Sequence, residues 1–391
     1  MENNFKKWPF FDEGDIDAVC AVLRSGKINR WTGSKNEEFE KKLCESVKCK
    51  YAIALANGSL ALELALVAAE VGEGDEVITT CRTFMASASC AVMRGAKPVV
   101  ADVDPNSQNI CAETIEKCIT PRTKAIVAVH HAGWPCDMDP IMALAKKYNL
   151  FVIEDCAQAH GAVYKGRPVG SIGDVAAWSY CQDKIITTGG EGGAVTTNNE
   201  AFWRKMWEYK DHGKSYDAVF NRPHPAGFRW LIESFGTNWR MTEMQAALGI
   251  RAYEKLPEWT RLRARNAKMY EAALSKFGCV RLTPPPAEIV HAYYKYYCFV
   301  RPENLKSGWT RDRIADEICA AGVPCFAGSC WNISAEKCFA DRGWSKTEQE
   351  LPNAYALKDT SLMLLTHPTL SEADMLRACE VIEGVLRRAQ K

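Results

Sequence analysis

The sequence WSYCQDKIITTGGEGGAVTT, residues 178–197, joins a short apolar run to one lysine and four glycines. The run 176–180 predicts a buried strand, and Lys184 follows it just before the glycine-rich turn. One interpretation is a surface lysine in front of a hairpin. The other is a partly desolvated amine with a lowered pKa, able to form a Schiff base with an aldehyde cofactor. Features elsewhere in the chain are needed to distinguish the surface lysine from the Schiff-base lysine.

Strands and helices alternate in the residues before this stretch. Alternation of this kind predicts right-handed crossovers and an α/β fold with a mostly parallel sheet between helices. Ligands of such sheets bind at the carboxyl ends of the strands. We expect strands at 51–56, 76–79, 98–103, 125–130 and 150–154, and helices at 12–25, 36–47, 60–71, 84–94, 112–119 and 138–148.

The chain has 391 residues, which exceeds one typical hydrophobic core. Helical patterns at 242–254 and 259–277 follow, and the second is long enough to join two domains. A strand at 293–300 and helices at 311–321 and 371–388 then form a smaller α/β unit. We expect a large domain of residues 1–255 and a small C-terminal domain of residues 256–391.

Composition excludes several classes of function. The chain has 49 basic and 48 acidic residues, so no basic surface for nucleic acid or an anionic membrane is indicated. The apolar runs are far shorter than the roughly 20 residues of a membrane span, and residues 1–15 contain no signal-peptide core. The 17 cysteines form no C-x-x-C pair, so we expect buried thiols in a reducing compartment, no metal site and a cytoplasmic protein.

Three features match the needs of pyridoxal phosphate (PLP), and each also has a simpler explanation. Gly58 and Ser59 begin a helix whose free N–H groups suit a phosphate, although Ser59 could be only a helix cap. Asp155 ends an apolar strand, where its carboxylate could pair with a protonated pyridine nitrogen or cap the loop. Lys184 is the third feature, with Ser179 as a second phosphate contact.

The chain resembles the DegT/DnrJ/StrS family of nucleotide-sugar aminotransferases, which have the aspartate-aminotransferase-like PLP fold of type I. The resemblance runs from near Trp31 to near Thr366. The series of motifs in this order is specific, although no single motif is. The motifs are ANGSLALELAL (56–66), TFMASA (83–88), ADVDP (101–105), KAIVAVHHAG (124–133), IEDCAQAHGA (153–162), WSYCQDKIITTGGEGG (178–193), DHG (211–213) and GTNWRMTEMQAALG (236–249).

The resemblance implies a role for each cofactor-binding position. Lys184 would form the Schiff base and then move the proton between substrate carbon and cofactor. Asp155 would pair with the pyridine nitrogen, Gln158 would contact the region of the ring hydroxyl, and Phe84 would stack on the ring. Three further residues would hold the phosphate: Gly58, Ser59 and Ser179.

The resemblance also implies partners. Asn238 would reach the phosphate of a neighbouring subunit, which predicts a homodimer with shared active sites. Arg240 would bind the amino donor or form a structural salt bridge. The expected reaction moves an amino group from L-glutamate to a nucleotide-linked keto-deoxysugar, most often a 4-keto-6-deoxy sugar, for polysaccharide biosynthesis.

Some positions depart from the common pattern of the family. Trp134, Trp178 and the segment 328–334 differ where we expect the sugar or its carrier, and His212, His291 and His367 are candidate substrate contacts or merely structural. A PLP-dependent sugar dehydratase is an alternative, but relatives of that type replace the lysine by histidine. A non-catalytic sensor with the same fold is another alternative, but it predicts loss of cofactor contacts that this chain retains.

Overall fold

The computed structural model describes residues 5–227 and 229–391, so the first four residues of the segment assessed for a signal peptide lie outside it. A seven-stranded sheet forms the centre of the molecule, and all its strands are parallel except β9. Its order is β1 (Tyr51–Leu55), β9 (Gly193–Thr197), β8 (Val175–Ser179), β5 (Phe151–Asp155), β4 (Thr123–Val129), β2 (Glu76–Thr80) and β3 (Lys97–Ala101). The expected α/β fold with a mostly parallel sheet is confirmed.

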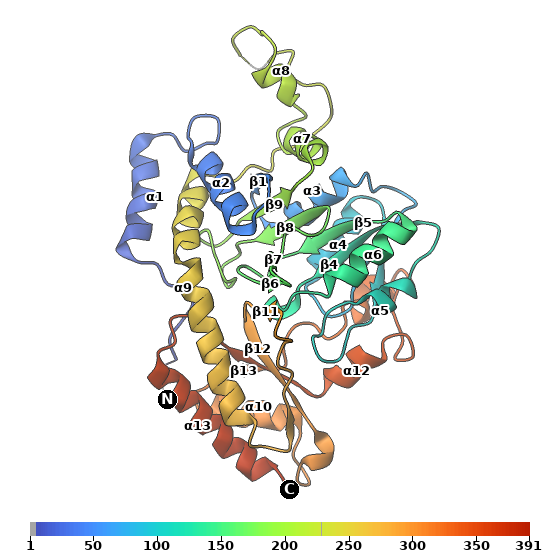
Figure 1. The fold of residues 1–391 in the computed structure, drawn as a ribbon, viewed down its shortest axis with the longest axis vertical. Coiled ribbons are helices and arrows are strands. Elements are labelled where there is room, and N and C mark those ends of the chain that lie inside the picture. Colours follow the sequence, from blue (N-terminus) through green and yellow to red (C-terminus); the bar gives the residue numbers. More distant parts are fainter. Residues whose placement is uncertain (1–4, 228) are drawn as a thin grey trace.

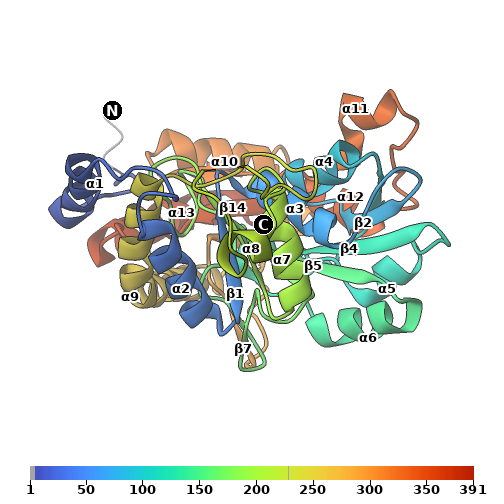
Figure 2. The same ribbon diagram turned by 90° about the horizontal axis from the view of Figure 1, so that it is seen from above.

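Helices cover both faces of this sheet, because successive strand residues point to opposite faces. Ile153 and Ala177 pack on one face against α3 (Gly58–Ala68), α4 (Ala86–Met93) and α7 (Glu200–Tyr209). Ala176 and Val152 point to the other face of the sheet, which a second set of helices covers (Figure 2). These helices are α2 (Lys35–Val47), α5 (Ala112–Glu116), α6 (Met138–Tyr148) and the first half of α9 (Glu243–Leu274).

The C-terminal part has its own antiparallel sheet. Its strands occur in the order β10 (Val280–Arg281), β12 (Lys295–Val300), β14 (Ser361–Leu365) and β13 (Cys325–Phe326). Two helices, α10 (Arg311–Ala320) and α13 (Glu372–Ala389), pack on it around a separate core. Shorter elements complete this part, namely η2 (Pro302–Asn304), η3 (Ile333–Ala335), α11 (Lys337–Ala340) and α12 (Pro352–Lys358).

One continuous helix joins the two parts. We expected separate helices at 242–254 and 259–277, but α9 runs unbroken over 32 residues with Pro257 inside it. Proline removes one backbone hydrogen bond. Packing at both ends holds the helix together, since Ile250 lies in the core beside the large sheet and Tyr270 lies in the C-terminal core. The boundary predicted at 255/256 therefore falls within α9 and stays a prediction (Figure 1).

The remaining elements are peripheral. The helix α1 (Glu13–Ser25) packs on α9, and η1 (His131–Gly133) follows β4. A small sheet of β11 (Ile289–Val290), β6 (Val163–Tyr164) and β7 (Arg167–Pro168) ties the C-terminal part to the large one. After α7 the chain forms a projection that carries α8 (Tyr216–Phe220) (Figure 1). Over the described residues, no helix has the length and apolar character that crossing a membrane requires.

Candidate active site

A cavity of about 1170 Å³ lies at the carboxyl ends of β5 and β8, between the large sheet and the C-terminal sheet. It is the place where a parallel sheet is expected to bind its ligand. Asn238, one of the eight residues predicted for the site, does not line this cavity of its own chain. The other seven do, namely Gly58, Ser59, Phe84, Asp155, Gln158, Ser179 and Lys184.

One end of the cavity suits an anionic group. Asn57 caps α3 by accepting a hydrogen bond from the amide of Leu60 at 3.0 Å. The N–H groups of Gly58 and Ser59 have no partner within the helix, because the first turn of a helix leaves such groups free. A Cβ on Gly58 would lie 2.6 Å from the Cβ of Ser179, so glycine is what allows the start of α3 to approach the end of β8. This approach places two serines beside the helix N-terminus.

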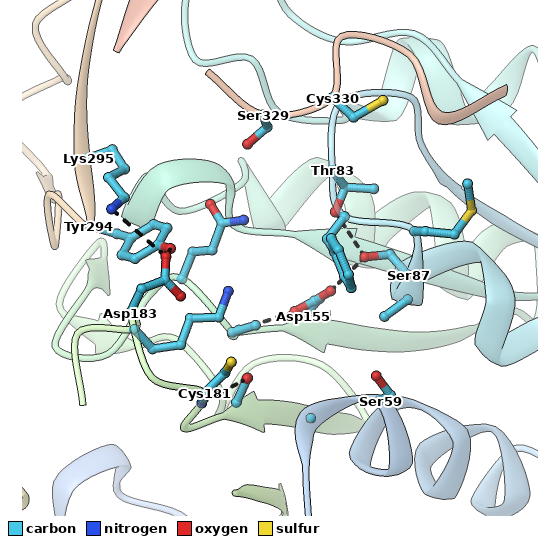
Figure 3. Close-up of a pocket in the computed structure, with 18 of the residues that line it drawn as sticks. Ser59, Thr83, Ser87, Asp155, Cys181, Asp183, Tyr294, Lys295, Ser329 and Cys330 are labelled. Atoms are coloured by element: carbon cyan, nitrogen blue, oxygen red, sulfur yellow. Dashed lines mark hydrogen bonds and ion pairs between the residues drawn. The ribbon is translucent and has the colours of Figure 1, made fainter. Parts of the chain in front are cut away.

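Asp155 lies on the floor of the cavity and is only 4% exposed. Its Oδ2 accepts a hydrogen bond of 2.8 Å from Ser87 Oγ, and its Oδ1 accepts one of 3.1 Å from the amide of Ala157. Ser87 is in turn 2.9 Å from Thr83 Oγ1, and this chain of polar groups leads from α4 to the carboxylate (Figure 3). These neutral donors fix the buried carboxylate at the cavity, where it could face a cation.

Two side chains beyond Asp155 are fixed by backbone groups. Gln158 accepts a 2.7 Å hydrogen bond from the amide of Ala132 through Oε1, which leaves its NH₂ group as the donor available to the cavity. His160 lies behind the cavity wall, with Nε2 2.9 Å from the carbonyl oxygen of Ser179. Burial lowers the pKa of His160 to about 4, so the ring is neutral and donates its Nε2–H to that oxygen. His160 therefore positions Ser179.

Lys184 extends into the cavity from the loop between β8 and β9. Its Nζ lies 5.2 Å from the centre of the Tyr294 ring, and its backbone carbonyl accepts a 2.8 Å hydrogen bond from the indole of Trp8. Phe84 lines the cavity with 72% of its surface exposed, so one face of an aromatic ring is free for a planar ligand. The structure thus brings Lys184, Asp155 and an aromatic surface together around one space.

Sequence reasoning missed a group next to Lys184. The hydroxyl of Tyr294 donates to the carboxylate of Asp183, and Lys295 Nζ lies 3.9 Å from the same carboxylate (Figure 3). Burial lowers the pKa of Lys295 to about 8, with the charges of Arg263 and Lys184 acting in the same direction and Asp183 against them. A lysine in the otherwise apolar strand pattern YKYYCFV was the available signal, but its neighbours come from distant parts of the chain.

The donor set fits PLP on structural grounds. The N-terminus of α3 and two serines match a phosphate, and buried Asp155 matches a protonated pyridine nitrogen. Lys184 supplies an amine from the adjacent loop. Within the described residues, His130, Glu154 and Cys156 are the one group close enough to hold a metal. The Glu154 carboxylate is already bound by His130 and by the amides of residues 170, 172 and 173, so this network is structural.

Comparison with known proteins agrees with this geometry. The profile of the DegT/DnrJ/EryC1/StrS aminotransferase family matches residues 9–383. The GDP-perosamine synthase of Caulobacter vibrioides is 39% identical over 383 residues, which cover 97% of each chain. The solved aminotransferase of Psychrobacter cryohalolentis is 53% identical with a TM-score of 0.96, covering 98% of this chain and 99% of that one.

The chain belongs to the DegT/DnrJ/EryC1/StrS aminotransferase family. It is a PLP-dependent sugar aminotransferase. A Streptococcus pneumoniae protein solved in a PLP form is 26% identical to this chain with a TM-score of 0.85, and the match covers 97% of each chain. The expected family, fold type and cofactor are confirmed, whereas the roles of individual site residues stay predictions.

The C-terminal part of this aminotransferase supplies the wall opposite the predicted cofactor-binding residues. Tyr297 accepts a hydrogen bond of 3.0 Å from the amide of Ser329, and Gly328 packs so closely on its ring that a Cβ would lie 2.6 Å away. Cys330 and Glu336 continue this wall. The segment 328–334, which departs from the family pattern, therefore does reach the cavity.

The two tryptophans that depart from the family pattern lie outside the cavity. We expected Trp178 near the sugar, but it is 1% exposed on the other face of the sheet, where its indole donates a 3.0 Å hydrogen bond to Thr196. Trp134 packs against His291 instead of the cavity, with ring centres 5.5 Å apart. Strand alternation explains the first error, because Trp178 and its neighbour Ser179 point to opposite faces.

The candidate histidines and Arg240 also lie outside the large cavity. His212 is exposed in the loop after α7, and His291 accepts a 2.8 Å hydrogen bond from the amide of Tyr293. His367 lines a smaller neighbouring cavity. Arg240 Nη1 lies 2.7 Å from the carboxylate of buried Asp211, so the structural salt bridge is the interpretation that the geometry favours.

Proposed function

We propose that this aminotransferase moves an amino group from L-glutamate to the keto group of a nucleotide-linked 4-keto-6-deoxysugar, with Lys184 as the catalytic residue. The observation that carries this proposal is the convergence of Lys184, buried Asp155 and the N-terminus of α3 on one cavity. Each feature has an ordinary explanation by itself. Together they match the amine, the acid and the phosphate site that a transaminase of this family needs.

Lys184 is the group that moves protons in this proposal. Its Nζ would hold the cofactor covalently, and its free amine would take a proton from the substrate carbon and return one to the bound substrate and cofactor. PLP supplies an electron sink that stabilises negative charge on that carbon. Asp155 would keep the pyridine nitrogen protonated, and the hydrogen bond from Ser87 holds Asp155 in place for that role.

The remaining cofactor contacts are assigned by position. The N–H groups of Gly58 and Ser59 and the hydroxyls of Ser59 and Ser179 would hold the phosphate, where the helix dipole favours negative charge. Phe84 would stack on the ring, and the NH₂ group of Gln158 would donate to the ring hydroxyl. The cavity of about 1170 Å³ has room for a sugar nucleotide beside the cofactor.

The wall formed by Tyr297, Ser329, Cys330 and Glu336 would contact the sugar, because these residues line the same cavity from the C-terminal part of the chain. The relative that acts as a GDP-perosamine synthase supports a GDP-linked substrate as the first to test. Amino sugars made on nucleotide carriers are activated for transfer, which supports a place in polysaccharide biosynthesis.

We also propose a homodimer in which Asn238 of one chain reaches the phosphate bound by the other. Asn238 lies outside the cavity of its own chain. The chain segment before it exposes large apolar side chains, including Trp230 at 84% and Phe235 at 99%. Exposed apolar surface of this kind is typical of a surface that a partner covers.

The free state of all 17 cysteines supports the cytoplasm as the compartment.

A substrate panel tests the function. The holoenzyme is incubated with L-glutamate and the GDP-, UDP- or dTDP-linked 4-keto-6-deoxysugar, and the nucleotide amino sugar and 2-oxoglutarate are measured by mass spectrometry. We expect one carrier to give equimolar amounts of both products. Turnover of simple keto acids without turnover of any ketosugar would contradict the proposal.

A further inference from the structure

A second cavity, of about 300 Å³, lies directly beside the active site. The two cavities share the residues Asp183, Tyr294, Lys295 and Leu365 as a common wall. Trp8 lines the smaller cavity and holds the backbone carbonyl of Lys184 through its indole N–H. A ligand in the smaller cavity would therefore lie next to the proposed catalytic lysine.

The smaller cavity is lined by the buried guanidinium of Arg263. Arg263 is only 1% exposed, and its Nη1 donates to the carbonyl oxygens of Tyr293 and Tyr294 at 3.4 and 3.3 Å. Among the described residues its Nε and Nη2 have no hydrogen-bond partner, and its guanidinium lies 5.3 Å from the centre of the Trp8 ring. The charge of Asp183 acts on this guanidinium without a close ion pair, and a buried guanidinium in that position is costly unless a further anion lies near it.

Lys295 adds a second positive charge where the two cavities meet. Its Nζ lies 4.6 Å from the Tyr294 ring centre and 3.9 Å from the carboxylate of Asp183, which is too far for a strong ion pair. The Asp183 side chain is 56% exposed and accepts the Tyr294 hydroxyl. Asp183 is the one carboxylate among the described residues that line the small cavity, and four cationic side chains line it as well: Lys6, Lys7, Arg263 and Lys295.

The large cavity, in contrast, is lined by more acidic than cationic side chains. Among its described lining residues, the acidic side chains are Asp155, Asp183, Glu191 and Glu336, and the cations are Lys184 and Lys295. In the proposed reaction Lys184 binds the cofactor. Lys295 is therefore the second lysine of the large cavity, and it is available to bind an acidic substrate next to the cofactor.

We propose that Lys295, with Arg263 behind it, binds a carboxylate of the acidic amino donor in the small cavity. The inference rests on the proposed function and adds a binding site for one of its two substrates. The donor carboxylate would take a hydrogen bond from Lys295 Nζ and bring a second negative charge, after that of Asp183, near Arg263. A volume of about 300 Å³ suits a small dicarboxylate and is too small for a nucleotide sugar.

The test separates the two half-reactions of the enzyme. In the first, the loss of cofactor absorbance on adding L-glutamate without ketosugar is followed at several glutamate concentrations. In the second, enzyme loaded with pyridoxamine phosphate is mixed with the ketosugar. The variants are Lys295→Gln and Lys295→Arg, and the matched control is Lys337→Gln, whose side chain is 87% exposed in the same part of the chain.

For Lys295→Gln we expect the glutamate concentration at half-maximal rate to rise about 10- to 100-fold, as expected for loss of a charge-assisted hydrogen bond. The ketosugar half-reaction should change less than about twofold, because the donor contact is the one removed. Lys295→Arg should recover part of the glutamate affinity, and Lys337→Gln should behave as wild type. A thermal unfolding midpoint measured for each variant shows whether it is folded.

Binding of glutarate, a dicarboxylate without an amino group, to the holoenzyme by calorimetry gives a readout that needs no turnover. We expect Lys295→Gln to weaken it by the same factor. An equal loss in both half-reactions, or a loss confined to the ketosugar, would overturn the proposal, and the second result would assign Lys295 to the diphosphate. If wild-type enzyme reacts with no amino acid, the proposed function fails, whereas glutarate binding still tests the subsite.

Discussion

Ser87 Oγ donates a 2.8 Å hydrogen bond to Oδ2 of Asp155, and this contact links α4 to the carboxylate on the cavity floor. Ser87→Ala removes it and leaves Asp155 with the amide of Ala157 as its donor. We expect PLP to bind the apoprotein about 10-fold more weakly, since a hydrogen bond to a charged group contributes about 1.5–3 kcal/mol. The measurement is a PLP titration of the apoprotein.

Ser89→Ala is the matched control for Ser87→Ala, because Ser89 lies on the same helix and does not line the cavity. Its PLP affinity should equal that of wild type. Equal PLP affinity in Ser87→Ala would show that Asp155 does not depend on this contact.

The close packing of Gly58 on Ser179 predicts a second result. In Gly58→Ala the new methyl group would meet the Cβ of Ser179 at 2.6 Å and its Cα at 3.1 Å, so the start of α3 has to shift. We expect a loss of about 1–3 kcal/mol in the free energy of unfolding, together with weaker PLP binding. Gly72→Ala is the control, because a Cβ there meets nothing within 4 Å. A Gly58→Ala protein with wild-type stability and PLP affinity would contradict the predicted phosphate site.

Much of this arrangement was predictable from the sequence. The strands 51–56 and 150–154 and the helix after Gly58 were predicted close to their observed bounds, because their apolar periodicity and turn residues are local signals. The positions of Asp155 and Ser179 at strand ends follow from the same pattern.

Other features could not be predicted because they depend on distant packing. Two helices were predicted where the single helix α9 runs through Pro257, because two separate cores hold that helix together. The contact of Lys295 with Asp183 joins residues that are 112 positions apart, and no local pattern links them. Trp178 was predicted at the wrong face because its strand has both faces buried, so hydrophobicity did not distinguish them.

The neutral state of His160 predicts acid sensitivity. Burial lowers its pKa from 6.5 to about 4, so between these values the unfolded chain binds a proton that the native protein does not. Stability therefore falls as the pH falls through this window, by about 3 kcal/mol from this group if it acts alone. In His160→Gln, whose amide can still donate to Ser179, the thermal midpoint should fall less between pH 6.5 and 4 than in wild type.

His212→Gln is the control for that experiment, because His212 is exposed. Its pH profile should match that of wild type. An unchanged profile in His160→Gln would mean that the buried ring is not what makes the protein sensitive to acid.

Shared active sites predict complementation between inactive variants. Asn238→Ala and Lys184→Ala should each be strongly impaired alone, because one lacks the proposed phosphate contact and the other lacks the amine. Mixed after mild dissociation, they should recover part of the activity through hybrid dimers that contain one intact site. The measurement is amino-sugar formation by the mixture, and the control is each variant treated in the same way without the other. Absence of recovered activity would argue against active sites shared across subunits.

The central claim is that Lys184 is the residue that binds the cofactor covalently. The most direct measurement is reduction of the holoenzyme with borohydride, followed by proteolysis and mass spectrometry of the peptides. We predict that the reduced phosphopyridoxyl group is found on Lys184, and that Lys184→Ala retains neither this adduct nor transamination. An adduct on another lysine such as Lys295, or turnover by Lys184→Ala, would contradict the account.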